Sequence, residues 1–287
     1  MFDNVLIAVD GRRGGRDAIA LAKRLAAPDA SFTLVHVDGH GPGSWWSHHV
    51  GEERAFDRSA FMLAAERERS AIRAAIVCVG GTAPEHALHD LAEQRAADLI
   101  VVGTSRRAPA GRVLLGADGR AWLQGARCAM ALAPRGCAES PTRFVQIGVG
   151  YDGSAEGEVA LAAARELAAR TGASIRALWI VSPRDVPRDE AIPANRAPAA
   201  RRLMSDRADR LRALDGIAGE VVYGGRSREL SRFSSRVDLL IVGAATHGSP
   251  QRRARGGVLR DLAASSTCPL LVVAPAMVGM RSAVHAG

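Results

Sequence analysis

Two glycine-bearing loops are the parts of this chain best suited to binding an anion. Gly103 closes one apolar run and is followed by Gly116, and Gly243 and Gly256 repeat that pattern further along the chain. Glycine lets the backbone approach a bound phosphate, and a helix that starts beside such a loop adds unpaired N–H groups and the positive end of its dipole. The two loops are therefore the first candidates for a phosphate-binding site.

These loops belong to an internal repeat whose landmarks recur at one constant offset. In the same order and at the same spacing, Asp98, Gly103, Gly116 and Cys128 recur as Asp238, Gly243, Gly256 and Cys268. A repeat this long indicates two copies of a domain of ~100–150 residues, each with its own core. The expected domains cover 1–137 and 142–287, with a boundary between Pro134 and Arg143.

Each copy alternates short apolar strands with helices, a pattern typical of a parallel sheet buried on both faces. The predicted strands cover 3–9, 31–37, 74–79, 98–103 and 128–133 in the first copy, and 144–150, 173–181, 218–223, 237–243 and 269–274 in the second. The predicted helices cover 15–27, 52–73, 83–96 and 116–126, then 155–171, 199–214, 227–235 and 256–265. The sequence therefore predicts two repeated, doubly wound α/β domains, each with a five-stranded parallel sheet.

Ligands of doubly wound sheets bind beyond the carboxyl ends of the strands, where the strand order reverses. One crevice is therefore expected in each copy. The expected lining residues are Ala8, Val9, Asp10, Val37 and Gly103 in the first crevice, and Gly150, Asp152, Ile180 and Gly243 in the second.

Four features carry a family resemblance: the Asp-Gly turn at 10–11, the Asp-Leu-Ile-Val-Val-Gly strand at 98–103, the glycine loop and the cysteine before the last strand. Together they resemble the universal stress protein family in its tandem two-domain form. The resemblance covers essentially the whole chain and implies the adenine nucleotide alpha hydrolase-like fold. In nucleotide-binding members a G-x2-G-x9-G-[S/T] loop follows the fourth strand, and its amides and hydroxyl hold the phosphates of ATP. The resemblance further implies that Asp10 faces the adenine and ribose end, and that Mg²⁺ is present only with ATP.

Both loops depart from that motif at its second glycine and at its hydroxyl. The matching residues are Gly103 and Gly116 in the first copy and Gly243 and Gly256 in the second; the departures are Arg106 and Ala117 in the first, and Thr246 and Gly257 in the second. Loss of one charge-assisted hydrogen bond to phosphate costs about 1.5–3 kcal/mol, or roughly ten- to a hundredfold in affinity. Neither loop is a complete phosphate site.

Charge offers a partial replacement for the lost contacts. The arginines of the two loops are Arg106, Arg107 and Arg112, and Arg252, Arg253 and Arg255. Such side chains bind phosphate directly, and Gly256 and Gly257 before Val258 form a candidate anion nest at the predicted helix start. Two alternatives stay open: weak residual ATP binding, or a degenerate loop that retains only the fold.

The amino-acid composition limits the classes of partner and the cellular location that are expected. The net charge of +8 suggests nucleic acid, but the arginines are spread over helix faces and only 4% of the residues are aromatic, which disfavours that partner. No apolar run could span a bilayer and the start lacks the basic flank of a signal peptide, so a cytoplasmic location away from membranes is expected. The four cysteines have no CxxC spacing and are expected to be reduced thiols, and the histidines at 36, 40, 48 and 49 share no metal-ligand spacing with other donors.

No motif of an activated nucleophile or of a P-loop is present, and the loop at 10–15 lacks the SGGxDS of ATP-pyrophosphatase-type ligases that share this fold. An enzymatic role is therefore disfavoured. The expected function is a non-catalytic stress-response regulatory or binding module; the alternative is a pure protein-interaction scaffold without nucleotide. The two copies are expected to pair within the chain through 129–133 and 270–274, while a homodimer and an unidentified protein partner stay open.

Overall fold

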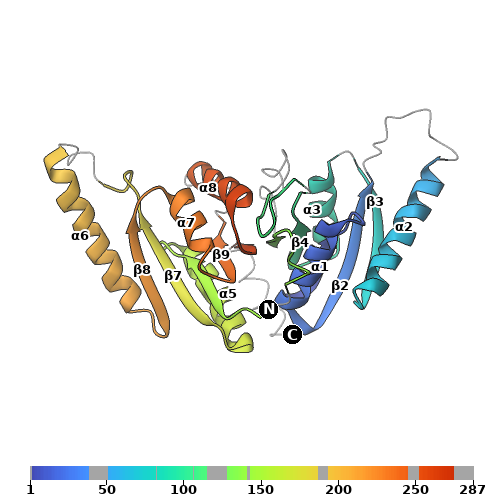
Figure 1. The fold of residues 1–287 in the computed structure, drawn as a ribbon, viewed down its shortest axis with the longest axis horizontal. Helices are drawn as coiled ribbons and strands as arrows, with labels where there is room; N and C mark the ends of the chain where they lie inside the picture. Colours follow the sequence, from blue (N-terminus) through green and yellow to red (C-terminus); the bar gives the residue numbers. More distant parts are fainter. Residues whose placement is uncertain are drawn as a thin grey trace. The chain divides into compact units, whose positions relative to one another are not determined.

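The computed structural model describes residues 2–38, 51–81, 83–105, 107–114, 128–140, 143–186, 193–244 and 252–274, without the side chains at 51–56, 193–196 and 252–256. The chain divides into two compact units, Met1–Thr142 and Arg143–Pro275 (Figure 1). The boundary therefore falls within the predicted junction, which runs from Pro134 to Arg143. The predicted helix at 116–126 lies outside the described residues, as do three of the noted histidines and the end of the second expected domain.

All described strands of the first unit pair in parallel, in the order β3-β2-β1-β4-β5. The strands are β1 (Phe2–Ala8), β2 (Ala26–Asp38), β3 (Ala74–Gly80), β4 (Leu99–Gly103) and β5 (Ala129–Ala133), and the helices are α1 (Arg13–Leu25), α2 (Gly51–Arg69) and α3 (Pro84–Gln94). Because crossovers between parallel strands are right-handed, α1 and α2 cover one face of the sheet and α3 covers the other. The strand order reverses between β1 and β4, which is where a crevice is expected.

The second unit repeats this order as β10-β9-β6-β7-β8, again in parallel. Its strands are β6 (Gln146–Gly150), β7 (Ser174–Val181), β8 (Ile217–Tyr223), β9 (Leu239–Gly243) and β10 (Leu270–Val273), and its helices are α5 (Ala155–Thr171), α6 (Pro193–Arg212), α7 (Arg226–Ser234) and α8 (Arg252–Ser265). The reversal now lies between β6 and β9. Both units therefore have the predicted doubly wound arrangement.

Four boundaries differ from the predicted ones by four residues or more. The helix predicted at 52–73 ends at Arg69. β2 begins at Ala26 rather than 31, because its first residues continue beside β1 through a shift in register between Phe2 and Asn4. α6 begins at Pro193 rather than 199: proline is tolerated in the first turn of a helix, and Pro198 removes only one backbone hydrogen bond further on. α8 begins at Arg252 rather than 256, which changes the expected phosphate site.

The repeated aspartates are used by the fold at the amino ends of the strands, away from the crevices. The carboxylate of Asp98 accepts the backbone N–H groups of Asp3 at 2.7 Å and Asn4 at 3.1 Å. Asp238 accepts those of Val145 and Gln146, both at 2.8 Å. Each carboxylate thus fixes the first residues of the central strand of its unit, which accounts for this aspartate in both copies.

The repeated cysteines lie beside these aspartates as free, buried thiols. Burial, and secondarily the carboxylate of Asp98, raises the pKa of Cys128 to about 12. Burial likewise raises the pKa of Cys268 to about 12, with a smaller contribution from Asp238. Both side chains are therefore packing groups in their thiol form.

Among the described residues, no helix has the length and apolar character needed to cross a membrane.

We expect Cys128 and Cys268 to resist alkylation in the folded protein. At about pH 8 a thiol with a pKa near 12 is ionised to roughly one part in ten thousand, and only the thiolate is nucleophilic. Mass spectrometry after iodoacetamide treatment should find both unmodified without denaturant and both modified in urea. The partly exposed Cys78 is the internal reference, and rapid labelling of Cys128 or Cys268 in native buffer would contradict this expectation.

Candidate functional site

A crevice opens at the carboxyl ends of the strands in each unit, at the reversal of strand order. In the first unit the structure brings together the predicted residues Ala8, Val9, Asp10, Val37 and Gly103. In the second it brings together Gly150, Asp152, Ile180, Gly243 and Val258. The predicted residues Arg106, Gly116, Ala117 and Thr246 lie outside the described residues. In each unit, predicted residues therefore lie together in the wall of one crevice.

The second crevice also contains residues that sequence reasoning missed. These are Tyr151, Ser154 and Glu156 beside the Asp-Gly turn, and Arg226, Leu230 and Leu262 on the opposite side. Arg226 and Leu230 open α7 with the same spacing that Pro84 and Leu88 have in α3, and Pro84 and Leu88 line the first crevice. At the offset that relates Asp98 to Asp238, however, Arg226 corresponds to His86, so this equivalence becomes visible only in the structure.

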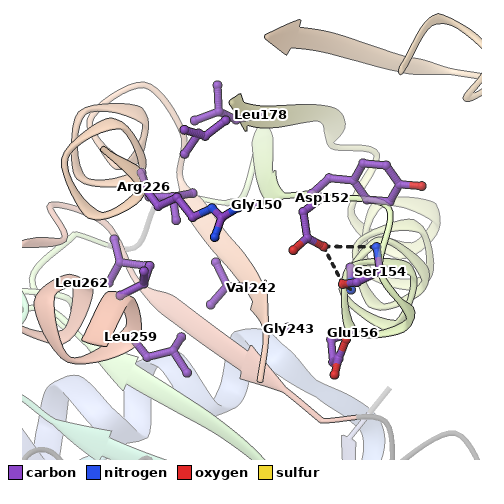
Figure 2. Close-up of a pocket in the computed structure, with 15 residues that line it drawn as sticks. Gly150, Asp152, Ser154, Glu156, Leu178, Arg226, Val242, Gly243, Leu259 and Leu262 are labelled. Carbon is purple, nitrogen blue, oxygen red and sulfur yellow. Dashed lines mark hydrogen bonds between the residues drawn. The ribbon is translucent and has the colours of Figure 1, made fainter. Parts of the chain in front are cut away.

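Asp152 is held at the start of α5 by a compact turn (Figure 2). Its Oδ1 accepts the backbone N–H of Ser154 at 3.1 Å and the hydroxyl of Ser154 at 2.5 Å. The hydroxyl oxygen in turn accepts the N–H of Gly157 at 3.1 Å and caps the helix. Gly153 has a φ of +70°, and a side chain there would also meet the ring of Trp179 at 2.8 Å. The turn therefore fixes an exposed carboxylate at the edge of the crevice.

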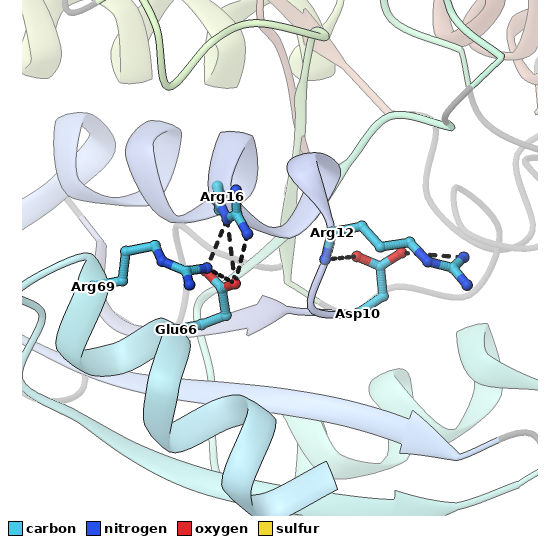
Figure 3. A network of polar contacts seen from close by, with 5 residues as sticks. All are labelled: Asp10, Arg12, Arg16, Glu66 and Arg69. Atoms are coloured by element: carbon cyan, nitrogen blue, oxygen red, sulfur yellow. Dashed lines mark hydrogen bonds and ion pairs between the residues drawn. The ribbon is translucent and has the colours of Figure 1, made fainter. Parts of the chain in front are cut away.

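Asp10 forms the corresponding turn in the first unit, but with a different neighbour (Figure 3). Its Oδ1 accepts the backbone N–H of Arg12 at 3.1 Å, and the guanidinium of Arg12 lies 3.9 Å from Oδ2. Both side chains are about half exposed, so this ion pair contributes little to stability. It nevertheless places a positive charge beside Asp10, whereas the equivalent neighbour of Asp152 is the uncharged Ser154.

The retained motif glycines at the strand ends are required by packing. A Cβ atom on Gly103 would lie 1.9 Å from the carbonyl oxygen of Gly14 in α1. A Cβ atom on Gly243 would lie 2.3 Å from the carbonyl oxygen of Glu156 in α5. In both units the end of a central strand touches the backbone of a helix, which only glycine permits. These two glycines would therefore be retained with or without a ligand.

The predicted anion nest at Gly256, Gly257 and Val258 is corrected by the start of α8. In an α-helix only the first four N–H groups lack an intrahelical acceptor. Because α8 begins at Arg252, the N–H groups from Gly256 onward point to carbonyl groups one turn earlier. Val258 lines the crevice, and Gly257 is not among the described residues that do so. The amides expected to hold phosphate are therefore used by the helix.

The loop after β4 is likewise closed on itself. The hydroxyl of Thr104 donates to the carbonyl oxygen of Leu114 at 2.8 Å and accepts its N–H at 2.5 Å. The N–H of Ser105 also donates to the Leu114 carbonyl, at 2.8 Å. Ala108 and Val113, which belong to this loop, are fully buried. The first amide beyond Thr104 is therefore engaged by the protein, and Arg107 and Arg112 remain exposed.

Arg226 gives the second crevice a positioned cation. Its Nη2 donates to both carboxylate oxygens of Asp185, at 2.8 and 3.1 Å, and Asp185 accepts the N–H of Ser182 at 2.7 Å. Figure 2 shows the guanidinium of Arg226 and the carboxylate of Asp152 on opposite sides of the crevice. The walls are buried leucine, isoleucine and valine side chains. The crevice thus combines a hydrogen-bond acceptor, a donor and an apolar surface.

Tyr151 lies beside this crevice but is committed elsewhere. Its hydroxyl donates to Glu158, and its ring packs edge-to-face on Trp179 with the centroids 5.2 Å apart. Burial raises the pKa of Tyr151 to about 12, and the hydrogen bond to Glu158 contributes further. Arg207 in turn stacks on Trp179, 5.0 Å from the ring centroid. Tyr151 therefore supports the turn that carries Asp152 and remains protonated at neutral pH.

Comparison with known proteins agrees with this architecture. The universal stress protein family matches residues 1–134 and, a second time, residues 144–274. A universal stress protein from Archaeoglobus fulgidus matches with a TM-score of 0.68 and 14% identity, over 95% of this chain and 98% of that chain. A putative universal stress protein from Pseudomonas aeruginosa UCBPP-PA14 matches with a TM-score of 0.59 and 12% identity, over 99% and 98% of the two chains. A functionally unknown protein from Pseudomonas aeruginosa PAO1 gives a TM-score of 0.59 and 12% identity, over 100% and 98%.

At these identities the solved structures show the fold, and they confirm the predicted α/β class with its adenine nucleotide alpha hydrolase-like sheet. The family itself is shown by the two matches, which together span nearly the whole chain and coincide with the two structural units. The chain therefore belongs to the universal stress protein family, in its tandem two-domain form.

Proposed function

We propose that this protein is a non-catalytic stress-response binding module whose second crevice holds a nucleotide weakly, through its nucleoside end. The observation that carries this proposal is the exposed carboxylate of Asp152 facing Arg226 across an apolar crevice, while α8 uses the amides of Gly256 to Val258. A carboxylate at this position of a doubly wound domain is suited to accept ribose hydroxyls. The phosphates then have few fixed partners.

A regulatory role is proposed rather than catalysis because the two hydroxyl groups at the crevice are committed to structure. The hydroxyl of Ser154 caps α5, and that of Tyr151 is bound to Glu158. General acid–base or nucleophilic catalysis needs such a group within reach of the substrate and free to exchange a proton. We therefore expect ATP hydrolysis to stay at a trace level, with Mg²⁺ present only as the companion of ATP.

A scaffold without nucleotide is the second candidate, and one observation favours it. The packing of Gly103 against Gly14 and of Gly243 against Glu156 accounts for the retained motif glycines without any ligand. In that case the chain would act through a surface that binds a protein partner. Pairing of the two domains through Ala129–Ala133 and 270–274 and a cytoplasmic location belong to both candidates.

Titration calorimetry with adenosine, AMP and ATP, each with and without Mg²⁺, tests the proposal. We expect adenosine and ATP to bind with affinities within about threefold of each other, because an uncompensated phosphate contact would change affinity by tenfold or more. Asp152→Ala should weaken binding about tenfold by removing the acceptor for the ribose. Asp10→Ala, the matched change in the first unit, should leave the titration unchanged. If none of the three ligands gives heat at millimolar concentration, the scaffold replaces the binding module.

A further inference from the structure

We infer that Trp179 and Arg207 are positioning residues for Asp152, and that helix α6 thereby takes part in ligand binding in the second crevice. The inference rests on the proposed function, because it concerns the carboxylate that is proposed to bind the ribose. Trp179 lies in β7 and Arg207 in α6, and neither is among the described residues that line the crevice. Both therefore act through another residue and not on the ligand itself.

The turn that carries Asp152 rests on the indole of Trp179. Gly153 has a φ of +70°, and a Cβ atom there would lie 2.8 Å from Cη2 of Trp179, so the backbone of the turn lies directly against the ring. The indole is buried, and Tyr151 packs edge-to-face on it with the centroids 5.2 Å apart. The hydrogen bonds between Asp152 and Ser154 shape the turn, and the indole determines where the turn lies against β7.

Arg207 holds the indole from α6. Its guanidinium carbon lies over the ring, 5.0 Å from the centroid, which is a favourable cation–π contact. The guanidinium is itself oriented by Asp206 of the same helix, whose Oδ2 lies 3.1 Å from Nη1. Helix α6 packs on β7 and β8 (Figure 1). A chain of contacts therefore runs from α6 through the indole to the Asp152 turn.

The first unit has a different residue at the place of Trp179. His36 stands there in β2, and its Nδ1 donates to the carbonyl oxygen of Val9 at 2.8 Å. The equivalent turn rests on a flexible side chain of α2, because a Cβ atom on Gly11 would lie 2.8 Å from Cγ of Met62. Methionine has three rotatable bonds and adapts to its neighbours, whereas an indole keeps its shape. The carboxylate of the second unit is thus placed more rigidly than that of the first.

Rigid placement of the carboxylate affects affinity for a direct reason. A hydroxyl group donates well to a carboxylate only at roughly 2.5–3.0 Å, and a turn that has to be ordered on binding lowers the affinity. Because Trp179 acts only through Asp152, its replacement cannot weaken binding more than the loss of the carboxylate does. This limit distinguishes a positioning residue from one that contacts the ligand.

A double-mutant cycle measured by NMR titration of the full chain with adenosine tests the inference. Trp179→Leu should raise the Kd by about three- to tenfold, the upper limit being the tenfold loss expected for Asp152→Ala. In the Asp152→Ala background the same change should alter the Kd by less than about twofold. Arg207→Met, which removes only the cation–π contact, should raise the Kd by about twofold and guards against a folding defect in the leucine variant. His36→Leu, the matched change in the first unit, should leave the Kd unchanged.

Hydrogen exchange without ligand measures the position of the turn independently of nucleotide binding. The N–H of Ser154 donates to Asp152 within the turn, and that of Gln146 donates to Asp238 at the other end of β6. In Trp179→Leu the amide of Ser154 should exchange several times faster than in the parent protein. Exchange at Gln146 should stay the same, because the sheet of the unit remains folded.

The outcomes separate this inference from the function on which it rests. A Kd that Trp179→Leu leaves unchanged, or raises equally with and without the Asp152 carboxylate, would overturn the inference and leave the binding module standing. Unchanged exchange at Ser154, or equally faster exchange at Gln146, would also overturn it, because Trp179 would then have no particular role at the turn. If adenosine does not bind the parent protein, the proposed function fails, and the exchange experiment alone decides whether Trp179 positions Asp152.

Discussion

Replacing Gly103 or Gly243 by alanine is expected to lower the free energy of unfolding of the corresponding unit by about 3 kcal/mol or more. The added Cβ atom would lie 1.9 Å from the Gly14 carbonyl oxygen in one unit and 2.3 Å from that of Glu156 in the other. The obstructing atoms belong to helix backbone, so relief requires α1 or α5 to move away from the sheet. Urea unfolding of each variant, followed by far-ultraviolet circular dichroism, measures the loss.

Gly257→Ala is the matched control, because it alters a glycine that stands at the hydroxyl position of the same motif, in a different environment. A Cβ atom at Gly257 would meet no other atom within 4 Å, and the residue lies inside α8. Alanine has a higher helix propensity than glycine, so this change should stabilise the second unit by about 0.5–1 kcal/mol. A small cost at Gly243 together with a large cost at Gly257 would show that the packing explanation is wrong.

This contrast bears on how the family motif is interpreted. Four glycines of the two loops match the nucleotide-binding pattern, but Gly103 and Gly243 also close the contact between a central strand and a helix. Their presence therefore carries little information about a ligand. The informative positions are those that differ between the two crevices, such as Arg226 and Pro84.

The sequence predicted the fold well because its signals are strong and duplicated. Runs such as Leu99–Gly103 and Leu239–Gly243 are apolar throughout, which suits strands buried on both faces of a parallel sheet. The spacing of the repeats predicted the two units. The carboxyl ends of the predicted strands then indicated the five crevice residues Ala8, Val9, Asp10, Val37 and Gly103, which the structure brings together. The repeated Asp98 and Asp238 marked the copies correctly, although their structural role became clear only from the bonds they accept.

The start of α8 and the role of Arg226 could not be predicted in the same way. Glycine is disfavoured inside a helix by about 1 kcal/mol, so Gly256 and Gly257 indicated a helix start. The buried side chains of Leu259 and Leu262 stabilise the helix through packing, which overrides that propensity. Arg226 stood in a helix rich in polar residues, and nothing in one copy alone separated it from a solvated arginine.

Asp17→Ala is expected to lower the stability of the first unit by about 1–3 kcal/mol, the cost of leaving a buried polar group without its partner, because the two amides that lose their acceptor are only partly buried. Asp17 lies in α1 with 2% of its surface exposed, and its carboxylate accepts the N–H groups of Gly136 at 3.1 Å and Ala138 at 2.8 Å. Arg24, from the same helix, donates to the carbonyl oxygens of Cys137 at 2.5 Å and Ser140 at 3.0 Å. The side chains of Asp17 and Arg24 in α1 thus hold the segment that follows β5. Chemical denaturation measures what Asp17 contributes to the stability of the unit.

The pH dependence of the same residue distinguishes a buried carboxylate from a generic packing defect. Burial raises the pKa of Asp17 above its ordinary value of 3.8, more than the two amide bonds lower it. A group whose pKa rises on folding contributes most stability below its unfolded pKa and loses that contribution as the pH rises through the folded pKa. The stability advantage of the parent protein over Asp17→Asn should therefore shrink as the pH is raised from about 4 toward neutrality. Arg24→Met is the control, because it removes the contacts of Arg24 with Cys137 and Ser140 but no titrating carboxylate, and its cost in stability should not depend on pH over that range. If the advantage of the parent protein over Asp17→Asn grew with pH, the raised pKa of Asp17 would be contradicted.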